Sequence, residues 1–138
     1  MPDLDAFVRY FETLTPAAVA RLGEHYADDA WFKDPFNEVQ GLPAIQRIFT
    51  HMFEQLEAPR FVVTERIVQP HGAMLAWDFH LTVRGKPLCI RGVSHVRWNA
   101  AGKIDYHRDY WDAAEELYAH LPAIGVLMRW LRRRLAAD

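Results

Sequence analysis

Acidic, imidazole and hydroxyl side chains gather near the end of the chain, in the stretch from Ser94 to Asp112. This stretch predicts a β-hairpin, because residues 99–102 (Asn-Ala-Ala-Gly) separate two runs rich in Val, Ile, Tyr and Trp. Residues two apart on a strand share a face, so His107, Asp109 and Trp111 point one way. The other face takes Tyr106, Arg108 and Tyr110. If the first set faces the core, its imidazole and carboxylate lie about 6.7 Å apart along the strand, at roughly 3.3 Å per residue.

A second carboxylate, Asp34, precedes Pro35 and is therefore expected at the end of a strand. If Asp34 and Asp109 share one pocket, desolvation and like charge raise the pKa of at least one. A base with a pKa near neutrality suits abstraction of a proton next to a carbonyl. In the alternative interpretation, Asp34 only caps the loop that follows it, and Asp109 is held by His107 or Arg91. A metal site of Asp34, His107 and Asp109 is conceivable, but no other short His or Cys spacing supports it.

Composition limits the classes of protein to be considered. The chain has 138 residues, of which 51% are hydrophobic, which is enough for one domain, residues 1–138, with its own core. A net charge of −2 lacks the basic excess that nucleic-acid binding requires. No apolar run is long enough to span a bilayer, and Asp3 and Asp5 do not fit a signal peptide. We therefore expect a cytoplasmic protein that binds neither nucleic acid nor membrane, and a buried Cys89.

Three helices are predicted before residue 57. Asp3 or Asp5 caps a first helix with an apolar face, and Thr15-Pro16 starts a second that carries Val19, Leu22 and Tyr26 and ends at Asp28-Asp29. Residues 30–34 favour a short strand and residues 36–41 a loop. Pro43 begins a third helix with a continuous apolar stripe to Leu56.

From residue 60 the hydrophobic period is two. Strands are predicted at 61–69, 73–84, 88–98 and 103–111, with connections so short that neighbouring strands must be antiparallel. Two helices, 112–121 and 122–135, follow. The fold class is therefore α+β, with helices on one face of a curved antiparallel sheet.

Several local motifs occur in a characteristic order. They are Val8-Arg9-Tyr10, Tyr26-Ala27-Asp28-Asp29-Ala30, Lys33-Asp34-Pro35, Gly41, and the run from His95 to Lys103. In order and spacing the chain resembles the nuclear-transport-factor-two-like superfamily, and within it the ketosteroid-isomerase and SnoaL-like polyketide-cyclase branch. The resemblance covers nearly the whole chain and implies a cone-shaped sheet closed on one side by the N-terminal helices, with an apolar pocket.

The resemblance also implies roles for individual residues. Asp34 matches the aspartate that shuttles the proton in ketosteroid isomerases, and Tyr10 matches a tyrosine that donates to the substrate oxyanion. Ser94 stands where those enzymes have a protonated aspartate, and a serine hydroxyl is a poorer donor. SnoaL-like cyclases are closer in this region, because they use a last-strand aspartate with a nearby histidine, as Asp109 and His107 would be here.

In the register of that fold, one set of aromatic side chains is expected to line the pocket, although most of it could be ordinary core. The set is Trp31, Phe53, Trp77, Phe79 and Trp111, with Leu81. The opposite face of the sheet carries Asp78, His80, Arg97 and Tyr106, through which we expect a homodimer.

The expected function is binding of a small hydrophobic carbonyl compound, with acid–base isomerisation or cyclisation that needs no cofactor or metal. One alternative is a non-catalytic ligand-binding or dimerisation module. Another is epoxide-hydrolase-like hydration, in which Asp34, Arg91 and Asp109 would act together, but strand alternation turns Arg91 outward. Arg129, Arg132, Arg133 and Arg134 flank Trp130 in the last helix and could contact a membrane surface, yet cations also suit a helix C-terminus.

Overall fold

The protein is described by a computed structural model that covers residues 1–116, 130–131 and 133–137. The first half of the chain forms α1 (Leu4–Glu12), the 3-10 helix η1 (Ala17–Glu24), β1 (Tyr26–Lys33), β2 (Glu38–Gln40) and α2 (Leu42–Gln55). The second half forms β3 (Glu57–Gln69), β4 (Gly72–Val83), β5 (Lys86–Trp98), β6 (Ile104–Tyr110) and α3 (Ala113–Glu116). The predicted α+β fold class is confirmed.

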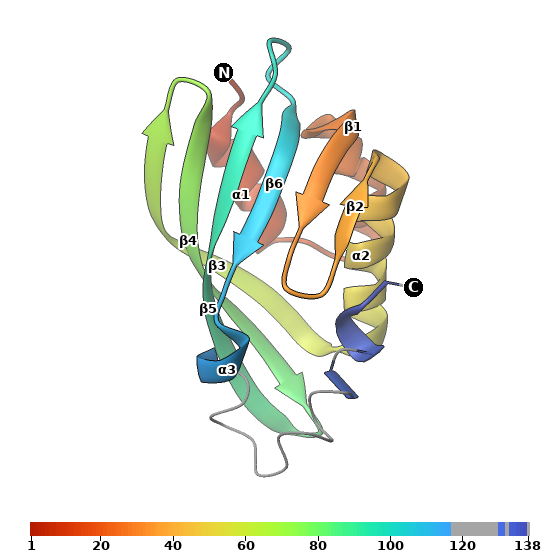
Figure 1. Cartoon of the computed structure of the whole chain (residues 1–138). Helices are drawn as coiled ribbons and strands as arrows, with labels where there is room; N and C mark the ends of the chain where they lie inside the picture. Colours follow the sequence, from red (N-terminus) through yellow and green to blue (C-terminus); the bar gives the residue numbers. More distant parts are fainter. Residues whose placement is uncertain (117–129, 132, 138) are drawn as a thin grey trace.

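The strands form a six-stranded open sheet in the order β2-β1-β6-β5-β4-β3 (Figure 1). The strands β3 to β6 are consecutive and antiparallel, as the short connections predict. The exception to a purely antiparallel sheet is β1, which pairs with β6 in parallel. This pair places Phe32 opposite His107 and so joins the early strand to the one that carries the candidate catalytic residues.

The start of β1 differs from the prediction. The second helix is a 3-10 helix that ends at Glu24, and the strand begins at Tyr26 rather than at Ala30. Tyr26 continues the helical spacing of Val19 and Leu22, but its side chain is also in strand register with buried Ala30 and Phe32. Periodicity alone could not separate these two assignments.

Two further strand segments occupy predicted loops. Residues Glu38–Gln40 form β2, because a tight turn after β1 returns the chain alongside it, with the Asp34 N–H donating to the Asn37 carbonyl at 2.9 Å. Strand β3 begins at Glu57, directly after α2. Both additions extend the edges of the sheet.

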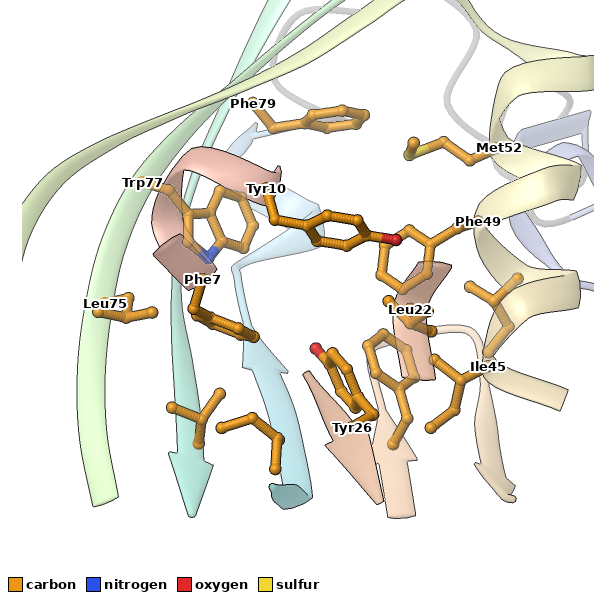
Figure 2. Close-up of a cluster of buried hydrophobic side chains, with 14 of the residues drawn as sticks. Phe7, Tyr10, Leu22, Tyr26, Ile45, Phe49, Met52, Leu75, Trp77 and Phe79 are labelled. Atoms are coloured by element: carbon orange, nitrogen blue, oxygen red, sulfur yellow. The ribbon is translucent and has the colours of Figure 1, made fainter. Parts of the chain in front are cut away.

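The helices α1 and α2 pack on one face of the sheet, here called the inner face (Figure 1). Asp3 caps α1 by accepting the Ala6 N–H at 3.0 Å, and Gly41, with φ of +100°, leads into α2 in a conformation that other residues rarely adopt. Figure 2 shows aromatic and aliphatic side chains from the helices and the strands meeting above the inner face.

The indole of Trp77 lies over Gly92, its cross-strand partner on β5. A Cβ atom built at Gly92 would come within 2.4 Å of that ring, so any larger residue would displace it. The glycine therefore sets the position of Trp77 on the inner face.

Strand alternation also decides where Cys89 lies. On β5 the buried side chains are Ile90, Ser94, Val96 and Trp98, whereas Cys89 is exposed on the opposite, outer face. The expectation that Cys89 is buried is wrong, because its place in an apolar strand does not fix its face.

The C-terminal helices predicted at 112–121 and 122–135 lie largely outside the described residues, since 117–129 are not described. The same holds for Arg129 and Arg132. Among the described residues, the Trp130 ring lies 4.9 Å from the guanidinium carbon of Arg84 and 4.8 Å from that of Arg134. In the described part of the chain, no helix combines the length and hydropathy needed to cross a bilayer.

Candidate functional site

Strand β6 presents His107 and Asp109 to the inner face, where His107 is 4% exposed and the Asp109 side chain 15% exposed. Antiparallel pairing sets Ser94 of β5 directly opposite Asp109. Ser94 is itself buried. Three polar side chains therefore share a region that is otherwise apolar, where each needs a hydrogen-bond partner.

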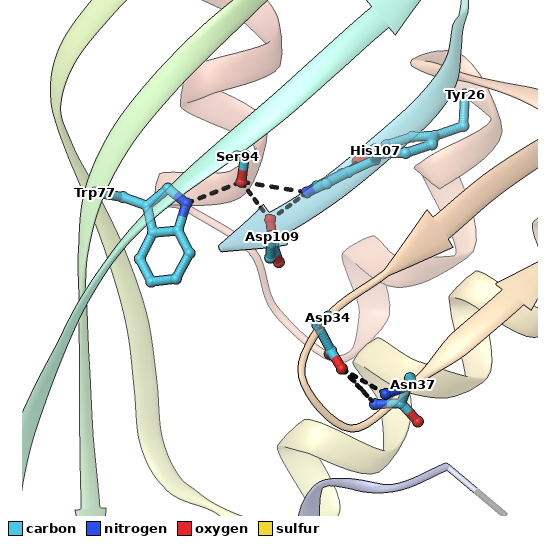
Figure 3. Close-up of polar contacts among 7 residues, drawn as sticks. All are labelled: Tyr26, Asp34, Asn37, Trp77, Ser94, His107 and Asp109. Carbon is cyan, nitrogen blue, oxygen red and sulfur yellow. Dashed lines mark hydrogen bonds and ion pairs between the residues drawn. The ribbon is translucent and has the colours of Figure 1, made fainter. Parts of the chain in front are cut away.

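Both hydrogen bonds that described residues make to the Asp109 carboxylate go to the same oxygen, Oδ1. This oxygen accepts the Ser94 hydroxyl at 2.5 Å and His107 Nε2–H at 2.7 Å (Figure 3). Ser94 Oγ in turn accepts the Trp77 indole N–H at 2.8 Å. No described residue hydrogen-bonds to Asp109 Oδ2, so this oxygen keeps its lone pairs for another group.

The protonation of His107 follows from its second nitrogen, Nδ1, which lies 2.5 Å from the Tyr26 hydroxyl. Burial, with a smaller effect from the charge of Asp109, raises the pKa of Tyr26 well above its usual value, so Tyr26 keeps its proton and donates it. Nδ1 must then accept, and Nε2 carries the hydrogen that Asp109 accepts. The geometry thus assigns one neutral tautomer to His107.

Tyr26 is a site residue that the sequence prediction did not identify. The sequence spacing predicts that Tyr26 lies on the apolar stripe of a helix. In the structure Tyr26 begins β1 and is fully buried beside His107, and the centroids of the two stacked rings are 5.9 Å apart. Tyr26 and Phe32 are an even number of residues apart, so on a strand both side chains point to the same face, and this spacing could have identified Tyr26 as a site residue.

Asp34 lies in the turn after β1, in different surroundings. Its Oδ1 accepts the main-chain N–H groups of Phe36 and Asn37 at 2.8 and 2.7 Å. The Asn37 side-chain amide lies 3.2 and 3.3 Å from its two oxygens, and Figure 3 shows Asn37 beside Asp34. Asn37 also donates to the Leu135 carbonyl, which ties the turn to the C-terminal segment. Asp34 therefore does cap the loop, as the alternative interpretation requires.

The pKa of Asp34 is nevertheless raised, to about 6. Burial is the largest cause, and the charge of Asp109 adds to it, while the hydrogen bonds from Phe36 and Asn37 oppose it. The carboxylate pair thus raises a pKa in the direction that desolvation and like charge require.

Both carboxylates border one apolar hollow of about 70 Å³, and Asp109 also borders a second, of about 30 Å³, together with Ser94 and His107. Trp77 lines both, whereas Phe79, Leu81 and Trp111 line the larger one. These two volumes hold a few water molecules or a ligand of few atoms, and both carboxylates also border an open groove of about 460 Å³.

Three predicted site residues, Trp31, Phe53 and Tyr10, do not border these hollows. Trp31 is on the outer face, stacked on Tyr106 with ring centroids 4.9 Å apart, because β1 buries Phe32 in its place. Phe53 is half-buried and packs against the core from α2, but the lining residues of that helix are Ile48, Phe49 and Met52. Neither side chain reaches the hollows.

Tyr10 is buried but borders neither hollow. Its hydroxyl donates to the Ala18 carbonyl at 2.7 Å, and burial raises its pKa to about 12. Its proton is therefore already engaged in holding α1 to η1.

Arg91 faces outward, as strand alternation predicts, and its Nε lies 2.7 Å from Glu116 Oε1. It cannot join Asp34 and Asp109 on the inner face without a rearrangement of β5. The hydration arrangement of two aspartates around an arginine is therefore absent from the described residues.

The fold recurs in solved structures. A hypothetical protein with a ketosteroid-isomerase-like fold from Catenulispora acidiphila, in complex with trimethylamine, aligns with a TM-score of 0.72 at 16% identity, over 88% of this chain and 96% of that one. A protein from Jannaschia sp. CCS1 described as a SnoaL-like polyketide cyclase gives 0.70 at 15% identity, over 88% and 90%. An epoxide hydrolase of the LEH-like type from M. tuberculosis gives 0.68 at 13%, over 93% and 92%. At these identities the likeness establishes the fold alone.

A search of curated protein sequences finds no match. The sequence does match the SnoaL-like domain family over residues 7–107, which is most of the chain and includes β1, β5 and most of the candidate site. The motifs, the open curved sheet and this match agree, and the chain therefore belongs to the SnoaL-like domain family.

Proposed function

We propose that this protein binds a small hydrophobic carbonyl compound and catalyses its enolisation by acid–base chemistry, leading to isomerisation or cyclisation. The observation that carries the proposal is a pair of carboxylates on one apolar hollow, each with different hydrogen-bond partners. A buried carboxyl group with a raised pKa beside a second carboxylate is typical of acid–base sites.

Asp109 is the proton acceptor in this mechanism. Ser94 and His107 hold Oδ1, and both hydrogen bonds favour the charged carboxylate, which leaves Oδ2 to face the substrate. Oδ2 takes the proton from the carbon next to the carbonyl, and the electrons of that C–H bond form the C=C bond of an enol.

Asp34 is the proton donor. Because its pKa is about 6, Asp34 carries a proton in about half of the molecules at pH 6 and in fewer at pH 7, and it passes this proton to the carbonyl oxygen as the C=O π bond opens. When Asp34 is protonated, the charge repulsion with Asp109 disappears. Asp34 takes back the enol O–H proton in either outcome. Where a C=C bond adjoins the enolised carbon, Asp109 returns its proton to the far carbon of the dienol and gives the isomer. In a molecule with a second carbonyl, the enol carbon attacks that carbonyl, whose oxygen takes the proton from Asp109, and a ring forms.

The experiment is hydrogen–deuterium exchange of cyclopentanone in D₂O, followed by NMR. We expect the protein to exchange the α-hydrogens roughly 10²- to 10⁴-fold faster than buffer with an equal concentration of free carboxylate. Buffer rates for cyclopentanone and for cyclohexanone, with folded protein, would contradict catalysis and leave the alternative of a ligand-binding module. The small hollow and the turn-capping bonds of Asp34 favour that alternative.

We also propose a homodimer formed through the outer face. Met74 and Tyr110 are 40% and 45% exposed there, and Tyr106 lies between the Trp31 ring and the Arg97 guanidinium. Aromatic, Met and Arg side chains are enriched in such interfaces. Sedimentation at micromolar concentration should give a dimer, and a 16.1 kDa species alone would contradict it.

A further inference from the structure

The outer face carries a cluster of metal-ligating side chains that the proposed reaction does not use. His80 of β4 is directly opposite Cys89 of β5, and Asp78 lies two residues before His80 on the same face. One ligand atom from each of the three residues lies within 4.8 Å of the other two. Strand pairing therefore brings a nitrogen, a sulfur and an oxygen donor together.

These distances are close to what a zinc-type ion requires. Bonds of about 2.0–2.3 Å in a tetrahedral arrangement place ligand atoms roughly 3.3–3.8 Å apart, so a shift of about 1 Å closes the site. His80 and Asp78 are half-buried and Cys89 is exposed, so small rotations of the side chains can supply that shift. No hydrogen bond or ion pair among the described residues engages these three side chains, and none has to be broken.

Two arginines neighbour the cluster, since Arg91 of β5 is directly opposite Asp78 and Arg60 of β3 is directly opposite His80. The guanidinium of Arg91 is itself paired with Glu116. A metal ion bound at Cys89 would take the place of the thiol proton, because a coordinating thiol is deprotonated.

We propose that Asp78, His80 and Cys89 form a binding site for a divalent cation of the zinc class, such as Zn²⁺ or Co²⁺. The donor set mixes thiolate, imidazole and carboxylate, which suits these ions and not Mg²⁺ or Ca²⁺. Three protein ligands leave a further position for water. The site is on the opposite face of the sheet from Asp109, so it acts as a clamp between β4 and β5 and is separate from the proposed catalytic hollow.

The test is titration of the reduced, metal-free full-length chain with CoCl₂, followed by the absorption band of a thiolate–cobalt bond. The sequence has a single cysteine, so this band reports Cys89 alone. We expect saturation at one Co²⁺ per chain, and loss of the band on addition of ZnCl₂. Zinc should also raise the melting temperature, because it binds the folded chain.

The variants Cys89→Ser and Cys89→Ala should abolish the band, and His80→Gln and Asp78→Asn should each weaken Co²⁺ binding at least about 10-fold. His71→Gln, which removes an exposed imidazole at the β3–β4 turn, should leave the titration unchanged. Circular dichroism establishes that each variant is folded.

Three outcomes would overturn the proposal. They are a folded wild-type chain with no thiolate band, a band that persists at unchanged affinity in His80→Gln, and saturation at half an equivalent, which would mean that one ion joins the cysteines of two copies. None of them bears on α-hydrogen exchange, so the two proposals fail independently.

Discussion

The two carboxylates of the inner face differ in what holds them. Asp109 projects from a central strand, and side chains from β5 and β6 fix one of its oxygens. Asp34 projects from a turn between two short strands, and main-chain N–H groups of that turn hold it. Both border the same hollow, and burial raises the pKa of Asp34 to about 6.

This difference shows how one hollow can contain an acid and a base of the same residue type. Side chains from neighbouring strands donate to one oxygen of Asp109, whereas both oxygens of Asp34 accept hydrogen bonds and burial still raises its pKa. The three predictions below test whether this division of roles is correct.

The largest effect is expected for Asp109→Asn. The amide still accepts hydrogen bonds from Ser94 and His107, but it cannot take a proton from carbon. We expect α-hydrogen exchange of cyclopentanone to fall by roughly 10²- to 10⁴-fold, with the fold unchanged. Asp28→Asn removes an exposed carboxylate of β1 and is the matched control. Equal rates in the two variants would assign the base elsewhere.

Asp34→Asn should slow exchange less, by roughly 10²-fold, and should also change stability. In wild type, the pKa of about 6 in the folded chain exceeds the value near 3.9 expected when unfolded. The folded chain therefore holds a proton that the unfolded chain releases, and this contribution to stability is lost as pH rises from about 4 to about 6.

The Asp34→Asn variant does not lose stability in this way as pH rises, because its amide does not titrate. Its side-chain oxygen can still accept the N–H groups of Phe36 and Asn37. Two units of pKa correspond to about 3 kcal/mol at most, so above pH 6 the variant should be more stable than wild type by up to that amount. Urea unfolding of both proteins at pH 4 and pH 7 measures the change. A difference that does not depend on pH would contradict a raised pKa at Asp34.

The smallest effect is expected for Tyr26→Phe, which leaves His107 Nδ1 without a donor. Loss of one buried hydrogen bond, about 1 kcal/mol, corresponds to about a fivefold lower rate, with KM unchanged. The ¹⁵N chemical shifts of His107 should show a mixture of tautomers in place of one. Tyr10→Phe is the comparison, because that hydroxyl is bound to Ala18 away from the hollows. A larger loss in Tyr10→Phe would restore Tyr10 as the oxyanion donor.

Local sequence patterns were sufficient for most of the sheet. Alternation along β4 and β6 predicted that Trp77, Phe79 and His107 face inward, and short turns predicted antiparallel order. The same alternation placed Arg91 outside, because period two leaves no other face for it. The faces of long strands are thus set by residues that are close in sequence.

What could not be predicted depends on contacts between distant residues. The face of Trp31 depends on where β1 begins, and that in turn depends on its pairing with β6, more than 70 residues later. The tautomer of His107 depends on the Tyr26 hydroxyl, whose presence in the site follows from the same pairing. Local periodicity carries no information about such partners.

The parallel pairing of β1 with β6 also has a consequence for folding. Tyr26 and His107 are 81 residues apart, and the helix α2 and four strands lie between them. Closing so long a loop is entropically unfavourable until the intervening strands are in place. The candidate site is therefore completed late on the folding pathway, and the Tyr26–His107 contact would report arrival at the native state.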